Sequence, residues 1–350
     1  MSGSSDGSGI AGDSGAAGGS GSSDGSGIAG DSGAAGGSGG RLTLLGHLCG
    51  LFAALNWGFT FILTDIAMGA GLTAYEALLL RSLTAYVFLW VICPKAPRLA
   101  LGNGLAGLAR AEWPYLVAGL SGLSIYFLLD YNALNYTSAS FVTILCGTVP
   151  LFIAMALWIA YREPPPRLFW AGFVIAVSGV ALVSTAGGQA LQVSLPGAAL
   201  VLAGNVLWAV YTILLRRIDG KDALLDLRRI FFWGVLSLLA CLPLMGFEAP
   251  IAVLCQPNVL VPVLVLGVMT SALTFLAYNL SVGWLGAAKA SVYTYFPPAV
   301  GALAAHFILG EHITPAGLVG IGVIIAGLLL SERAGGKGAG GEEAGGDSHA

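Results

Sequence analysis

Polar and aromatic side chains interrupt the apolar segments of this chain at helical spacing. Two segments each carry an asparagine with aromatic residues and threonines close by, namely Asn56, Trp57, Thr60 and Thr64, and Asn205, Trp208, Tyr211 and Thr212. Residues three or four positions apart share one face of a helix. An amide without a partner in an apolar medium costs several kcal/mol, so each asparagine must either join helices or line a cavity. Such side chains could bind a small amphipathic solute.

Two further segments combine a polar face with a proline. Their members are Thr143, Cys146, Gly147 and Pro150 in one segment, and Ala290, Tyr293, Thr294 and Pro297 in the other. Proline frees a backbone carbonyl, which in lipid must face protein or a water-filled cavity. We expect both faces to line a cavity, and packing at a kink is the alternative. The residues expected to bind the solute are Asn56, Trp57, Thr60, Thr143, Pro150, Asn205, Trp208, Tyr211, Tyr278, Tyr293, Thr294 and Pro297.

Charged side chains inside apolar segments form a third group. Arg81 lies about seven residues inside its segment, or roughly 10 Å at 1.5 Å per residue. A charge at such a depth needs a partner. We expect Arg81 to pair with Asp130 or Asp65 in one state and to exchange or lose that partner in another, which gives these three residues a gating or coupling role. The alternative is a structural pair between Arg81 and Glu76.

The composition indicates that these segments cross a lipid bilayer. Charged residues make up 9% of the 350 and hydrophobic residues 56%, and the mean hydropathy is +0.84. A soluble domain carries about 25% charged residues. Ten apolar runs approach the length of about 20 residues that spans hydrocarbon, and they are 43–68, 74–92, 115–134, 139–160, 168–185, 197–215, 230–247, 259–281, 288–309 and 314–331. We therefore predict an all-α integral membrane protein with ten transmembrane helices.

The chain is internally duplicated. Residues recur 147 or 148 positions later in the pairs Tyr131/Tyr278, Pro150/Pro297 and Glu163/Glu311. Each half holds five predicted spans, and an odd number forces the second half to enter the membrane with the opposite orientation. We predict inverted repeats over 41–185 and 196–333. The Gly/Ser-rich tails 1–40 and 334–350 have too few apolar residues to order, so we expect them to be disordered.

Basic residues orient the predicted spans. If both termini face the cytoplasm, 14 of the 15 Lys and Arg fall on or beside the cytoplasmic side, and Arg81 is the exception. Basic residues concentrate on that side of bacterial and eukaryotic membrane proteins alike. The glycine pairs Gly172/Gly179 and Gly320/Gly327 keep one helix face small for close packing, within each half or in a homodimer. We expect a multi-pass protein of the cytoplasmic (inner) membrane.

These features resemble the drug/metabolite transporter superfamily, and specifically its EamA branch. The pieces that carry the resemblance are Trp57-Gly58, Arg81, Ala133-Leu134 before Tyr136-Thr137-Ser138, Pro150, Glu163 and Gly172…Gly179, with second-half echoes at Trp208, Pro297, Glu311 and Gly320…Gly327. The resemblance implies an exporter of small metabolites with a central cavity between the halves. It implies no particular substrate.

The motifs leave a secondary transporter as the favoured function. The sequence has no HExxH, GxSxG or Walker A motif, and no filter-like repeat or ring of charges that would favour a channel. We expect no enzyme activity, no cofactor and no nucleic-acid partner. The five cysteines are scattered and suggest neither disulfides nor a metal site. The expected cavity suits a small amphipathic solute such as an amino acid, and the alternative cargo is an apolar drug or toxic organic compound.

Overall fold

The computed structural model describes residues 33–95, 104–162, 164, 167–186, 194–215, 217–218, 222–286, 290, 292–308, 310 and 314–339. Residues 40–350 form one compact unit. Every regular element in the described ranges is a helix, which confirms the predicted all-α class. Helices α1 and α16 extend into the two predicted tails, and the remainder of each tail lies outside the described residues, as do Glu163 and Glu311.

The helices follow a similar order in the two halves, except that α1 and α2 correspond to the continuous α9 and that α11 has no counterpart in the first half. The first half contains α1 (Gly33–Gly58), α2 (Thr60–Gly69), α3 (Ala74–Ile92), α4 (Gly104–Gly119), η2 (Leu120–Ser124), α5 (Ile125–Ala133), α6 (Ala139–Cys146), α7 (Val149–Tyr161) and α8 (Arg167–Ala186). The second contains α9 (Leu195–Leu215), α10 (Ala223–Met245), α11 (Ile251–Leu254), α12 (Pro257–Val265), η4 (Leu266–Leu273), α13 (Thr274–Leu285), η5 (Val292–Tyr295), α15 (Pro297–Ile308) and α16 (Pro315–Ala339).

Seven helical stretches in the described residues are long and apolar enough to cross a membrane. They are Arg41–Gly69, Ala74–Ile92, Ala109–Ala133, Ala139–Tyr161, Leu195–Leu215, Ala223–Met245 and Pro257–Leu285. Each coincides with a predicted span. The other three predicted spans fall on α8, on η5 with α15, and on α16, so the count of ten membrane crossings stays a prediction.

Matching helices are interrupted at matching places in the two halves. A π-helical segment, η2 or η4, separates α4 from α5 and α12 from α13. The helix that precedes each repeated proline is also broken, because α7 and α15 begin again at Val149 and Pro297. Interruptions of this kind are tolerated in membrane helices where the freed backbone lies inside the protein. The two repeats therefore resemble each other also in the places where these helices are interrupted.

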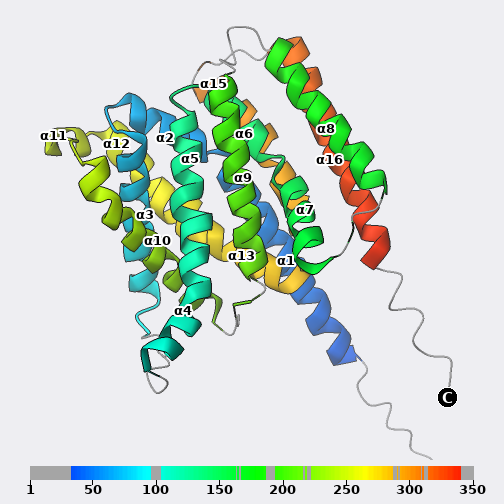
Figure 1. Cartoon of the computed structure of the whole chain (residues 1–350), viewed down its shortest axis with the longest axis horizontal. Helices are drawn as coiled ribbons and strands as arrows, with labels where there is room; N and C mark the ends of the chain where they lie inside the picture. Colours follow the sequence, from blue (N-terminus) through cyan, green and yellow to red (C-terminus); the bar gives the residue numbers. More distant parts are fainter. Residues whose placement is uncertain are drawn as a thin grey trace, which may run out of the picture. The chain divides into compact units, whose positions relative to one another are not determined.

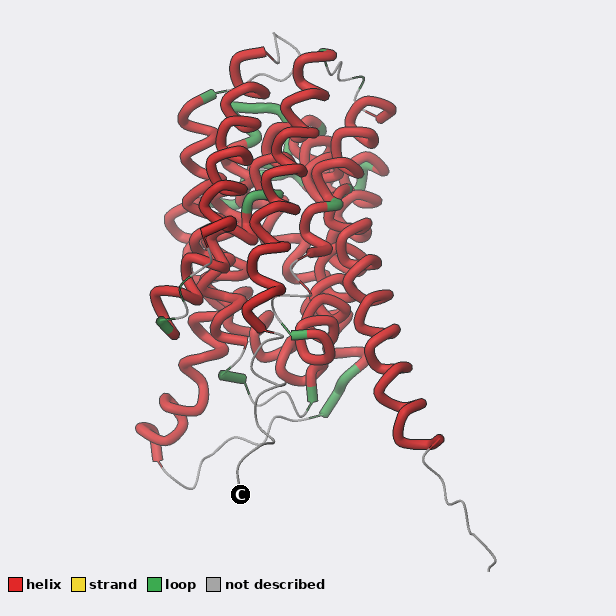
Figure 2. The backbone as a smooth tube through the Cα atoms, turned by 90° about the vertical axis from the view of Figure 1, so that its right-hand side faces the viewer, coloured by secondary structure: helices red, strands yellow, loops and turns green. Residues whose placement is uncertain are grey.

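Helices of one half pack mainly on helices of the other. The pairs α8 and α16, α5 and α9, and α6 and α15 lie side by side, and α3 contacts both α10 and η4 (Figure 1). Figure 2 shows that the helices run alongside one another in a bundle. Because every one of these pairs joins the two halves, residues from both halves meet along the middle of the bundle.

The glycine face predicted from the sequence joins α8 to α16. A Cβ added to Gly327 would lie 2.6 Å from the carbonyl oxygen of Gly172, and one added to Gly179 would lie 2.7 Å from the backbone nitrogen of Ile324. Such distances are far below van der Waals contact, so these positions admit only glycine while the helices stay this close. The glycine pairs have the expected packing role, but the contact joins the two halves and does not lie within each half, as the sequence suggested.

Candidate functional site

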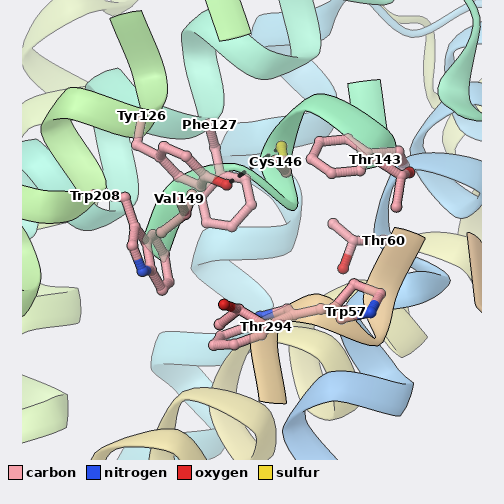
Figure 3. A pocket seen from close by; sticks show the side chains of 11 residues that line it. Trp57, Thr60, Tyr126, Phe127, Thr143, Cys146, Val149, Trp208 and Thr294 are labelled. Atoms are coloured by element: carbon pink, nitrogen blue, oxygen red, sulfur yellow. Dashed lines mark hydrogen bonds between the residues drawn. The ribbon is translucent and has the colours of Figure 1, made fainter. Parts of the chain in front are cut away.

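A small cavity lies in the middle of the bundle (Figure 3). Its volume is about 50 Å³, and its lining residues are Trp57, Thr60, Phe61, Tyr126, Phe127, Thr143, Cys146, Val149, Trp208, Thr294 and Pro297. One water needs about 10–15 Å³ on this measure, so the cavity has room for a few waters. Drug-sized ligands occupy pockets of roughly 300–1,000 Å³. This conformation must therefore widen before the cavity can hold a larger solute.

Aromatic side chains form much of the cavity wall, and Trp208 lies at the centre of a group of aromatic rings in and behind this wall. The ring centroid of Trp208 lies 5.4 Å from Trp57, 4.9 Å from Tyr126, 5.1 Å from Tyr211 and 5.5 Å from Phe275, and Tyr278 lies 5.0 Å from Trp57. We call these six residues the aromatic cluster. Edge-to-face and tilted pairs at such distances stabilise one another by about 0.5–1.5 kcal/mol each. Because members come from both halves, the cluster holds the halves together beside the cavity.

One polar group of the cavity wall has no partner. The hydroxyl oxygen of Thr60 is buried and makes no hydrogen bond within the described residues, whereas the hydroxyl of Thr143 donates to the carbonyl of Ala139 at 2.8 Å. Buried polar groups are nearly always hydrogen-bonded. The Thr60 hydroxyl is therefore available to water or to a bound solute.

Six of the twelve residues expected to bind the solute line this cavity, namely Trp57, Thr60, Thr143, Trp208, Thr294 and Pro297. The two asparagines have other partners. The side chain of Asn205 donates to the carbonyl of Leu145 and to the hydroxyl of Thr148, both at 3.0 Å, and so joins α9 to the break between α6 and α7. The side chain of Asn56 donates to the carbonyl of Phe52 at 2.8 Å, within its own helix.

The remaining four expected residues lie near the cavity or away from it. Tyr211 and Tyr278 belong to the aromatic cluster, and the Tyr211 hydroxyl donates to the side-chain oxygen of Asn279 at 3.0 Å. Pro150 is buried in the first turn of α7. The hydroxyl of Tyr293 lies 2.6 Å from Nδ1 of His47, in the middle of α1, and Tyr293 does not line the cavity.

Arg81 is buried just behind the cavity wall. Its Nε and Nη2 donate to the hydroxyl of Ser271 at 2.8 and 2.6 Å, and its Nη1 donates to the hydroxyl of Tyr131. The guanidinium carbon lies 4.1 Å above the ring of Phe127, one of the lining residues. Within the described residues no carboxylate forms an ion pair with Arg81. The guanidinium charge is therefore stabilised by the hydroxyls of Ser271 and Tyr131 and by the face of the Phe127 ring.

The three carboxylates considered as partners of Arg81 lie elsewhere. Glu76 accepts from the backbone nitrogen of Thr73 at 2.8 Å, and from those of Glu248 at 2.7 Å and Ala249 at 2.8 Å. The alternative pair of Arg81 with Glu76 is therefore not formed in this structure, because Glu76 caps α3 and holds the loop before α11. Asp65 lines a second cavity of about 560 Å³ near the end of α2.

Asp130 is fully buried on the face of α5 that meets α9. Its Oδ2 accepts from the thiol of Cys146 at 3.6 Å. Its Oδ1 makes no hydrogen bond within the described residues. The three residues given a gating or coupling role thus form no ion pair with one another here, and the exchange of partners between them stays a prediction.

Four lining residues were not expected from the sequence: Phe61, Tyr126, Phe127 and Val149. Cys146 lines the cavity on the face that it was expected to share with Thr143 and Pro150, although it was not named among the residues that bind the solute. The other four are apolar or aromatic residues inside apolar segments. Nothing in such a segment distinguishes a ring that faces a cavity from one that packs in the core.

Comparison with known proteins agrees with this architecture. The model of the EamA-like transporter family matches residues 44–185 and again 195–333. A protein of Archaeoglobus fulgidus named "Uncharacterized transporter" is 27% identical over 81% of this chain and 96% of its own length. The "Probable terminal-alkyne amino-acid exporter" of Streptantibioticus cattleyicolor is 30% identical over 67% of this chain and 79% of its own length. A solved structure described as "Crystal structure of protein" has a TM-score of 0.58 at 17% identity and covers 83% of this chain and 96% of its own.

The fold and the site define a multi-pass membrane transporter built from two repeats. The chain belongs to the EamA-like transporter family of the drug/metabolite transporter superfamily. It is a transporter and not an enzyme, and it works in a lipid bilayer on a small-molecule substrate.

Proposed function

We propose that this transporter exports a small amphipathic metabolite, an amino acid, across the cytoplasmic membrane by alternating access. The observation that carries the proposal is the central cavity with an aromatic wall and the unpartnered hydroxyl of Thr60. Aromatic rings offer contact area to an apolar side chain, and a free hydroxyl offers a hydrogen bond to a polar group. The expected substrate-binding role of the aromatic cluster follows from this chemistry.

The arrangement of the cavity supports alternating access. Its lining residues come from both repeats, and in transporters of inverted repeats the substrate site lies where the repeats meet. A relative movement of the halves would therefore change the cavity from both sides. We propose that the contact of Arg81 with Ser271 holds the halves in the present conformation, and that Arg81 reaches Asp65 or Asp130 in another.

The cargo is inferred from the charges near the cavity. The wall residues are uncharged, and one guanidinium, that of Arg81, lies behind Phe127. A multiply anionic solute would find too little positive charge to offset its desolvation. An amino acid, with an apolar side chain and a single carboxylate, fits this distribution better. The name of the Streptantibioticus cattleyicolor relative supports the same class of cargo.

A ligand panel tests the cargo. The purified protein in detergent would be heated with amino acids, with their amides, and with planar apolar compounds, and the unfolding temperature would be recorded. A ligand at 100 times its dissociation constant stabilises the folded state by about 2.7 kcal/mol. We expect an amino acid to raise the unfolding temperature and its amide to raise it less. Stabilisation by the planar compounds alone would instead identify the alternative cargo, drugs or toxic organic compounds.

The orientation is tested separately, in a background without the native cysteines. We expect a cysteine at Asn135, in the exposed turn between α5 and α6, to react with an impermeant thiol reagent added outside cells. A cysteine at Lys95, beyond the end of α3, should be protected. Both side chains are exposed in the structure, so the reaction reports the side of the membrane. The opposite pattern would reverse the proposed placement of both termini in the cytoplasm.

A further inference from the structure

Asp130 is a carboxylic acid buried in the bundle, and no cationic side chain among the described residues forms an ion pair with it. Its side chain is 0% exposed. The nearest arginine along the neighbouring helix α3, Arg81, is hydrogen-bonded to Ser271 and Tyr131 and forms no ion pair with a described carboxylate. A buried carboxylate that lacks a cation is expensive to keep charged inside a membrane protein. Taking up a proton removes that charge.

A short hydrogen-bonded chain links Asp130 to the cavity. The thiol of Cys146 donates to Oδ2 of Asp130 at 3.6 Å, and the hydroxyl of Tyr126 donates to the sulfur of Cys146 at 3.8 Å. Both Tyr126 and Cys146 line the cavity, and Figure 3 shows the hydrogen bond between them. A single side chain, that of Cys146, thus separates the cavity from the carboxyl group.

The other surroundings of Asp130 offer it no charge. Its Oδ1 faces Gly204 of α9, where an added Cβ would lie 2.8 Å away, and this oxygen makes no hydrogen bond with a described residue. Helix α9 contains no charged residue, and its titratable side chain, Tyr211, donates to Asn279. From α3, the guanidinium of Arg81 contacts α5 at Phe127 and Tyr131 and forms no ion pair with Asp130. One carboxyl oxygen is therefore free to carry a proton.

The duplication indicates that this acid is not needed to build the helix. Tyr131 and Tyr278 are repeat counterparts, 147 positions apart, and the same shift takes Asp130 to Ala277. Ala277 also lies buried in its helix. The same scaffold position thus folds with a methyl group in one half and a carboxylic acid in the other. The acid is an addition to one half of the scaffold.

We propose that Asp130 is the proton-binding site through which a proton gradient drives export. This rests on the proposed function and names its driving ion. A hydronium ion that enters the cavity supplies the proton by way of the Cys146 thiol. The S–H bond breaks as an O–H bond forms on a carboxylate oxygen of Asp130, the sulfur takes a proton from the hydronium ion, which becomes water, and the negative charge of the carboxylate is removed. The proton leaves by the reverse steps, to water, when a conformation opens to the other side.

Infrared spectroscopy tests the site without any substrate. We expect difference spectra between low and high pH to contain the C=O stretch of a protonated carboxylic acid in the wild-type protein, and to lose this band in Asp130→Asn. The matched control is Glu248→Gln, which removes an exposed carboxylate and should leave the band in place. If Asp130→Asn does not fold, Cys146→Ala serves instead, because losing the thiol donor should shift the band. A band unchanged in these variants would overturn the proton site.

Transport tests the coupling. In proteoliposomes, Asp130→Asn should still exchange labelled for unlabelled amino acid, because the asparagine mimics the protonated acid, although the loss of a partner for Arg81 should slow the exchange. The accumulation that an imposed pH gradient drives should be at least tenfold lower in this variant than in the wild type. Gradient-driven accumulation equal to that of the wild type would overturn the coupling and leave the proposed export intact. If the wild type exchanges no amino acid although the infrared band depends on Asp130, the proposed cargo fails and the proton site stands.

Discussion

Arg81 in α3 and Ser271 in η4 join the two repeats through two hydrogen bonds, at 2.8 Å from Nε and 2.6 Å from Nη2. The serine hydroxyl also donates to the carbonyl of Leu266 at 2.6 Å, across the π-helical segment. A buried cation of one half is thus held by an interruption in a helix of the other. Any movement of the halves that separates α3 from η4 must break this contact.

Removing the serine hydroxyl should weaken the contact. Ser271→Ala leaves two guanidinium N–H groups of Arg81 without an acceptor, and an unsatisfied buried group costs about 1–3 kcal/mol, more when charged. We expect a lower unfolding temperature in detergent together with altered transport. The matched control is Ser82→Ala on α3, whose hydroxyl is buried and makes no hydrogen bond within the described residues. An equal loss in both variants would show that the contact has no special role.

Replacing the arginine tests the gate itself. Arg81→Gln should reduce transport strongly while the protein still reaches the membrane, because the glutamine can still bond to Ser271 but carries no charge to exchange between partners. Expression and initial transport rates would be measured together. Transport at the wild-type rate would contradict a gating role for Arg81, and loss of folded protein would assign it to structure.

Trp208 should matter more than any other aromatic residue of the cavity. It contacts the five other rings of the aromatic cluster, and each such pair is worth about 0.5–1.5 kcal/mol. Because about 1.4 kcal/mol is a tenfold change in affinity, we expect Trp208→Ala to weaken substrate binding by roughly tenfold or more. The comparison is Trp90→Ala, at a side chain that is 52% exposed. Similar affinities in the two variants would exclude the cluster from the binding site.

The contact of α8 with α16 gives a prediction on stability. Gly327→Ala would place a methyl group 2.6 Å from the carbonyl oxygen of Gly172, so the helices must separate. Overpacking of this kind costs about 1–3 kcal/mol. Gly322→Ala is the control on the same helix, because a Cβ there meets nothing within 4 Å. Thermal unfolding should distinguish the two, and equal unfolding temperatures would argue against close packing of α8 on α16.

The start of α10 gives a prediction on pH dependence. Lys95 forms a salt bridge with Asp222 at 3.1 Å, and the backbone nitrogen of Leu225 donates to the same carboxylate at 3.2 Å. These two contacts lower the pKa of Asp222 below its ordinary value of 3.8. A lowered pKa in the folded state stabilises the protein above the ordinary value, and this contribution is lost as the pH falls through the folded value. Asparagine is also a good N-cap. We expect Asp222→Asn to remove the part of the fall in unfolding temperature at low pH that is due to Asp222, with little other loss of stability. Asp222→Ala should lower the free energy of unfolding by about 0.5–2 kcal/mol. A fall at low pH that is as large in Asp222→Asn as in the wild type would contradict the assignment.

The sequence alone predicts the all-α class of this fold because the lipid bilayer restricts which structures can cross it. Lipid forces long apolar helices, and the shift of 147 positions exposes the duplication, so both the helical class and the two repeats were predictable. The meeting of Trp57 with Trp208 was not. Their ring centroids lie 5.4 Å apart although the residues belong to different repeats. Such a contact depends on how the helices of the two halves interlock, which no local pattern encodes.

The partners of individual polar residues were predictable only where the pattern is local. Thr73 and Glu76 have the spacing of a capping box, T-x-x-E, and the structure forms that box at the start of α3. This local spacing would have indicated the role of Glu76, which the sequence analysis considered only as a partner of Arg81. Asn205 could equally have lined the cavity or joined helices, and its partners Leu145 and Thr148 come from a distant segment.

The central claim, export of an amino acid through the cavity around Trp208, is tested most directly by counterflow. Proteoliposomes containing the purified protein would be loaded with an unlabelled amino acid, and the entry of the labelled form would be followed over time. We predict a transient accumulation of the labelled amino acid that saturates with its concentration. The free amino acid should inhibit this accumulation more strongly than its amide does. At limiting substrate, Trp208→Ala should reduce the accumulation by roughly tenfold. Entry no faster than into protein-free vesicles, across a panel of amino acids, would contradict the account.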